Sequence, residues 1–105
     1  MAWIHLVIAG LLEVAWAIGL KQSEGFSKLV PSAFTLVTMA ASFYLLASAM
    51  RSLPAGTAYA VWTGIGAVGT VLIGIFWLNE PVNAGRVLSL TLLVAGLIGL
   101  KVSSA

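Results

Sequence analysis

The sequence contains no cysteine and very few charged side chains. Without cysteine the chain can form neither a disulfide bond nor a thiolate metal site, and it has no cysteine nucleophile. The redox state of its compartment is therefore left open. His5 is the single histidine, and one imidazole does not make a metal site, so we expect neither a metal nor a cofactor.

The small number of charges also indicates where the chain resides. Only 8% of the 105 residues are charged and 61% are hydrophobic, whereas a water-soluble domain of this length needs many more charges to cover its core. The five basic residues are scattered near the ends of apolar runs. Because they form no basic face, we do not expect nucleic acid as a partner. The composition predicts an integral membrane protein.

Four apolar segments are each long enough to span a bilayer. A helix rises about 1.5 Å per residue, so roughly 20 residues match a hydrocarbon core about 30 Å thick. Period-two alternation is absent, which excludes a β-barrel. Short connections break the run near Pro31, Pro54 and Pro81. We predict an all-α membrane protein with one domain, an up-down bundle with both chain ends on one side, and helices at about 2–20, 29–50, 55–78 and 82–100.

The first segment is expected to remain as a helix and not to be removed as a signal peptide. Met1 leads straight into apolar residues without a basic region, and Glu13 would interrupt the apolar part of a signal. Orientation is less clear, because basic residues near helix ends are nearly balanced. Three of them fall on one side and two on the other, Lys21, Lys28 and Arg86 against Arg51 and Lys101. The chain either inserts in both directions or has one weakly favoured topology.

Glu13 is the acid that needs an explanation. Glu24 and Glu80 lie in predicted loops, but Glu13 lies near the centre of the first segment. A charged group there costs on the order of 2.5–3.5 kcal/mol on insertion scales. No lysine or arginine lies in the middle of any segment to neutralise it. Its partner must therefore come from outside the chain, unless Glu13 stays protonated and hydrogen-bonds between helices.

Helical spacing predicts which residues share the surroundings of Glu13. Gly10 and Trp16 lie on its face at i−3 and i+3. Tyr59 and Trp62 share a face of the third helix with Thr63 and Gly66, and Ser42 is the most central polar residue of the second helix. Simpler explanations exist: Trp16 as an interfacial anchor, the third-helix aromatics as bundle packing, and Ser42 bonded back to its own helix.

Together these residues describe a small pocket suited to a cation. Aromatic faces attract cations, a carboxylate supplies the charge, and the Trp16 N–H and the Ser42 O–H can orient that carboxylate. Burial disfavours the ionised carboxylate, so a proton and a cation compete for the same group. If the site opens to one side at a time, this competition produces exchange. No nucleophile, base and orienting acid can be assembled, so we do not expect an enzyme.

Four helices around a central acid leave little room for a pathway with two gates, which favours a dimer. An antiparallel dimer would supply the inverted symmetry that many transporters build from internal repeats. Gly64 and Gly66 in the third helix either permit a bend or serve packing. Gly96 and Gly99 in the fourth helix give a small-residue surface that predicts a dimer contact.

The motifs "AGLLEVAWAIGLK", "GFSKLVPS" and "LPAGTAYAVWTGIGAVG" resemble the small multidrug resistance family, in particular its guanidinium-exporter subtype. The resemblance covers all four helices. It implies an antiparallel, dual-topology homodimer that exports guanidinium ion in exchange for protons across the bacterial inner membrane. It further implies that Glu13 is the shared proton and substrate site, with Trp16, Ser42, Tyr59 and Trp62 as the surrounding network. Trp16 favours this subtype over the quaternary-ammonium exporters of the family.

The physical argument agrees with that substrate, because planar guanidinium offers pairs of N–H donors that match a carboxylate. Small substituted guanidinium or ammonium compounds are further candidate substrates. Two other functions stay open, namely a proton-coupled exporter of quaternary ammonium drugs and a membrane subunit that transports nothing. A paired heterodimer also stays open, although the near-even charge balance argues mildly against it.

Overall fold

A computed structural model of the chain describes residues 2–103, and the regular structure in this range is entirely helical. The helices are α1 (Ala2–Gln22), α2 (Leu29–Ala49), α3 (Ala55–Trp77) and α4 (Ala84–Ser103). Each helix is long enough and apolar enough to cross a membrane. The structure therefore confirms the all-α class with four helices capable of spanning the bilayer.

The last helix differs most from its predicted range, for local reasons. It begins at Ala84 and not at 82, because the side-chain oxygen of Asn83 accepts a hydrogen bond of 2.9 Å from the backbone N–H of Arg86. Asn83 thus caps the first turn. The helix also continues past Lys101 to Ser103.

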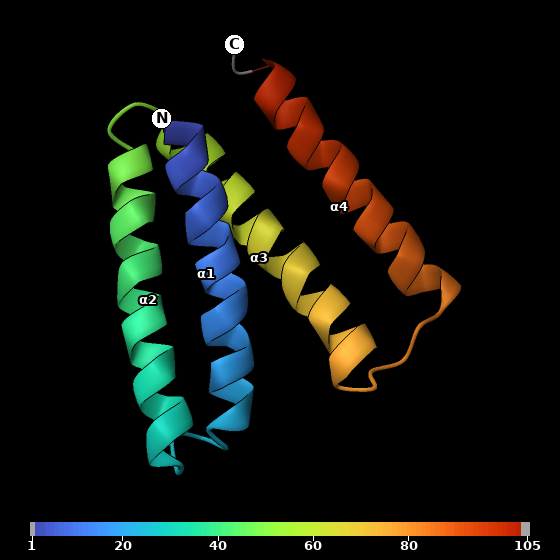
Figure 1. Cartoon of the computed structure of the whole chain (residues 1–105). Coiled ribbons are helices and arrows are strands. Elements are labelled where there is room, and N and C mark those ends of the chain that lie inside the picture. Colours follow the sequence, from blue (N-terminus) through green and yellow to red (C-terminus); the bar gives the residue numbers. More distant parts are fainter. Residues whose placement is uncertain (1, 104–105) are drawn as a thin grey trace.

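The helices alternate in direction, and α1 begins at the end of the molecule where α4 finishes (Figure 1). Helix α1 packs against both α2 and α3, whereas α4 leans away and contacts mainly α3. No residue of α4 is buried. The predicted four-helix bundle is therefore not closed: three helices pack together and the fourth stands apart.

The buried core lies at one end of the three packed helices. It combines the first half of α1, the last part of α2 and the beginning of α3, with the residues Leu6, Ala9, Leu46, Ala49, Ala58, Val61 and Trp62. Beyond this core, α3 diverges from α1 and α2 (Figure 1). The Cα positions consequently spread over 43 × 35 × 16 Å, a flattened arrangement.

Two of the three acids lie in the loops, as expected. Glu24 pairs with Lys28 at 2.7 Å, and the hydrogen bond from that ammonium lowers the pKa of the Glu24 carboxyl. Glu80, in the connection between α3 and α4, pairs with Arg86 in the first turn of α4 at 3.4 Å. Glu13 is therefore the one acid within a spanning helix of the described chain.

Candidate functional site

Glu13 projects from α1 toward α3, just beyond the buried core. Its carboxylate lies directly against Gly66, where an added Cβ would overlap the Oε1, Cδ and Cγ atoms of Glu13. The absence of a side chain at Gly66 therefore creates the space that the carboxylate occupies. Oε1 of Glu13 is buried and has no hydrogen-bond partner among residues 2–103. Glu13 also forms no salt bridge within residues 2–103, because the two ion pairs there involve Glu24 and Glu80.

Trp16 lies one helical turn after Glu13 on the same helix and is half-buried. Its indole N–H is buried and, within residues 2–103, has no acceptor. Its ring lies edge-on to Phe43 of α2, with 6.2 Å between centroids and an interplanar angle of 70°. An unpaired acceptor on Glu13 and an unpaired donor on Trp16 thus lie close together on α1. Such buried polar atoms are costly unless something outside the subunit satisfies them.

Ser42 joins three helices by hydrogen bonds. Its fully buried hydroxyl donates to the backbone carbonyl of Ala9 on α1 at 2.7 Å and accepts the indole N–H of Trp62 on α3 at 2.9 Å. The alternative of a bond back to its own helix is therefore wrong. The structure also differs from the expectation that Ser42 donates to Glu13, because a hydroxyl has one proton and Ala9 accepts it.

Aromatic rings connect Ser42 and Trp62 to Trp16. The ring centroids of Tyr59 and Trp62 are 5.7 Å apart, those of Trp62 and Phe43 are 5.7 Å apart, and Phe43 leads on to Trp16. Trp62 is buried, while Tyr59 has 56% of its surface exposed. Sequence reasoning missed Phe43. The available signal was its position directly after Ser42, the central polar residue of α2.

The site glycines have packing roles. A Cβ at Gly10 would overlap Ile65 of α3, and one at Gly64 would overlap Leu97 of α4. Helix α3 runs without interruption past both Gly64 and Gly66. These contacts favour the packing explanation for the glycines, and the predicted bend stays a prediction.

The fourth-helix glycines, Gly96 and Gly99, are exposed. An added Cβ at Gly96 or Gly99 would meet no atom within 4 Å. Both positions are therefore open surface in the single chain, and the predicted dimer contact stays a prediction. Within residues 2–103 no three His, Asp or Glu side chains gather in a way that could hold a metal ion. The described chain thus holds one carboxylate against Gly66 and, beside Trp16, a chain of aromatic rings that leads through Phe43 to Trp62, Tyr59 and the Ser42 hydroxyl.

Comparisons with known proteins agree with the motifs. A family model described as Small Multidrug Resistance protein matches residues 1–93. A protein of Yersinia pseudotuberculosis serotype I (strain IP32953) named "Guanidinium exporter" is 70% identical over 104 residues, which are 99% of this chain and 100% of the relative. Proteins of the same name from Escherichia coli (strain K12) and Citrobacter freundii are 62% and 60% identical over 104 residues, with 99% of each chain covered. The resemblance noted in the sequence is thereby confirmed.

Proposed function

The chain belongs to the small multidrug resistance family, and we propose that it exports guanidinium ion across a bacterial inner membrane in exchange for protons. The observation that carries the proposal is the similarity, at 60–70% identity and over nearly the full length of both chains, to relatives named guanidinium exporter. The four membrane-spanning helices support the same function, since they make this a multi-pass membrane protein.

Glu13 is the group that both ions would share. It is the one acid in a membrane-spanning helix of residues 2–103, and its buried Oε1 has no partner there. A proton on the carboxylate removes the charge that attracts a cation, and a bound cation disfavours the proton. Exchange follows from this competition when the site faces one side of the membrane at a time.

Guanidinium suits this carboxylate better than a larger cation does. Its planar N–H donors can form two parallel hydrogen bonds with one carboxylate. Tyr59, Trp62 and Trp16 provide aromatic faces and edges around a small planar ion. Small substituted guanidinium or ammonium compounds are included in the proposal where the added group fits beside these rings.

An antiparallel homodimer would complete the site. The Cα positions of a single chain extend only 16 Å in their shortest direction, which is about two layers of helices, so one subunit cannot enclose a pathway around Glu13. The Trp16 indole N–H is buried and lacks an acceptor within residues 2–103. A cation cannot accept that bond, but the Glu13 carboxylate of a second subunit can.

The test is transport by purified protein in liposomes. We expect guanidinium to be taken up against its gradient when the lumen is more acidic, and tetraethylammonium to compete weakly because it has no N–H donors. Protein with Glu24→Gln, which removes an acid in a loop, should transport like wild type. Uptake of tetraethylammonium that exceeds uptake of guanidinium would replace this function with that of a quaternary ammonium exporter.

A further inference from the structure

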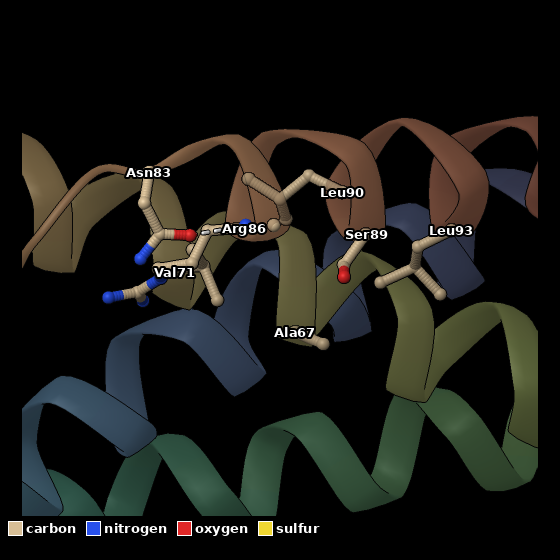
Figure 2. A pocket seen from close by; sticks show the side chains of 8 residues that line it. Ala67, Val71, Asn83, Arg86, Ser89, Leu90 and Leu93 are labelled. Carbon is tan, nitrogen blue, oxygen red and sulfur yellow. Dashed lines mark hydrogen bonds between the residues drawn. The ribbon is translucent and has the colours of Figure 1, made fainter.

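A groove outside the proposed transport site runs between α3 and the first half of α4 (Figure 2). It is lined by Ala67 and Val71 of α3 and, along α4 and the residue before it, by Asn83, Gly85, Arg86, Ser89, Leu90 and Leu93. The groove exists because α4 leans away from the three packed helices and leaves one side of α3 uncovered.

The chemistry of the groove changes along its length. Asn83 and Arg86 lie at the start of α4, next to the loop that connects α3 to α4. Ser89 follows one turn deeper, about 4.5 Å along the helix axis at a rise of 1.5 Å per residue. Leu90 and Leu93 then continue the wall into the apolar part of the span (Figure 2). The order from surface to interior is therefore cation and amide, then hydroxyl, then hydrocarbon.

The polar side chains of the groove keep N–H groups that can still donate hydrogen bonds. Arg86 donates to the carbonyl of Pro81 at 2.9 Å and to Glu80 at 3.4 Å, which uses two of the five N–H groups of its guanidinium. The Asn83 side-chain oxygen is occupied by the Arg86 backbone N–H, which leaves its NH₂ group as a donor.

Ser89 differs from the other hydroxyls of α4. Thr91 donates to the carbonyl of Val87 at 2.8 Å, and Ser103 donates to that of Gly99 at 2.8 Å. The Ser89 hydroxyl has no hydrogen bond to any of residues 2–103, and it is directed toward α3 across the groove (Figure 2). Ser89 is exposed in the single chain, and a hydroxyl that faces hydrocarbon there would be stabilised by an acceptor from another molecule.

We propose that the groove binds one membrane phospholipid. Its phosphate accepts hydrogen bonds from Arg86 and Asn83, an ester carbonyl accepts the Ser89 hydroxyl, and an acyl chain lies along Leu90, Leu93 and Val71. A phospholipid presents phosphate, ester and hydrocarbon in the same order along the membrane normal as the groove presents its donors and its apolar wall. The carboxylate of Glu80 sits over Gly74 on α3 and holds the Arg86 guanidinium at the groove mouth.

A bound lipid would also provide packing that the chain lacks. Helix α4 has no buried residue, and the groove leaves its first half separated from α3. A lipid wedged there would fill the gap and fix how far α4 stands from the other helices. Because ligands that bind only the folded protein stabilise it, added phospholipid should raise the thermal stability of the protein.

The experiment is native mass spectrometry of the purified full-length protein in detergent, titrated with phosphatidylglycerol or with diacylglycerol of the same acyl chains. We expect wild type to retain one phosphatidylglycerol per subunit and to retain diacylglycerol at least about tenfold more weakly, since the phosphate contacts are charge-assisted. Arg86→Gln should weaken phosphatidylglycerol by about tenfold and Ser89→Ala by a smaller factor. Millimolar inorganic phosphate should not displace the lipid.

Lys21→Gln is the matched control, because Lys21 is an exposed cation at the same end of the molecule but does not line the groove. It should bind the lipid like wild type. Equal retention of both lipids, or equal losses for Lys21→Gln and Arg86→Gln, would show nonspecific adhesion and overturn the proposal. It is also overturned if no lipid is retained and a cysteine at Leu93, in this cysteine-free chain, forms a disulfide with a second copy. In that case a partner subunit fills the groove.

Discussion

Ser42 is the residue on which the packing of the site depends most directly. Replacing it by alanine leaves the buried Trp62 N–H without its acceptor, and an unsatisfied buried donor costs about 1–3 kcal/mol. We therefore predict that Ser42→Ala lowers the free energy of unfolding by this amount, measured by denaturation in mixed micelles. In a Trp62→Phe background the same change should cost clearly less, because no donor is left unsatisfied. Equal costs in both backgrounds would mean that this bond contributes nothing.

For single residues, the sequence predicted which side chains belong to the site better than it predicted which atoms they contact. Helical spacing grouped Glu13 with Trp16 and drew attention to Ser42, because polar residues in an apolar span are few and conspicuous. It could not predict that Ser42 bonds to Ala9, since a backbone carbonyl is present at every position and leaves no mark in the sequence. Phe43 was missed because an aromatic residue in an apolar helix is ordinary.

Helix α3 provides a test that separates packing from bending. Gly66→Ala should weaken guanidinium binding by roughly tenfold or more, because the added Cβ overlaps the Glu13 carboxylate and disturbs charge-assisted bonds. Gly64→Ala meets Leu97 of α4 instead and should mainly lower stability. Gly56→Ala on the same helix meets no atom within 4 Å and should leave binding unchanged. Binding is measured by isothermal titration calorimetry with guanidinium. A hinge role predicts the opposite pattern, with Gly64→Ala and Gly66→Ala both slowing transport at unchanged affinity.

The four helices themselves were predictable because segment length and apolarity are set by bilayer thickness. The residues at which the helices begin and end were less predictable. The fourth helix starts later than expected because Asn83 caps it, and a cap depends on side-chain geometry that spacing alone does not reveal.

The arrangement of the whole molecule was the least predictable feature, because a closed bundle and an open one have the same apolar segments. Helix α4 has no buried residue, and the sequence does not reveal this, because an apolar helix facing lipid has the same composition as one facing protein. The proposal of a second subunit rests on the buried Trp16 N–H, which has no acceptor among residues 2–103, and on the 16 Å shortest extent of the single chain.

Dual topology is the prediction that belongs to this scale. Ser52→Cys and Val82→Cys place single thiols in the α2–α3 and α3–α4 loops, which lie at opposite ends of α3. A membrane-impermeant maleimide should label each variant partly from either side of the membrane. Two lysines added at the carboxyl terminus should restrict labelling to one side and lower transport, and coexpression with an oppositely biased variant should restore it. If the cysteine variants without the added lysines are each labelled from one side only, an antiparallel dimer of identical chains is ruled out.

The central claim is that Glu13 exchanges protons for guanidinium. The most direct measurement follows the pH inside liposomes that contain purified protein, with a pH-sensitive dye in the lumen and an imposed guanidinium gradient. Wild type should move protons against the direction of guanidinium flow, and the movement should stop when the gradient is removed. Glu13→Gln, whose neutral amide neither releases a proton nor attracts the cation, should give no response, while Glu24→Gln should respond like wild type. A normal pH change with the Glu13→Gln protein would contradict the account.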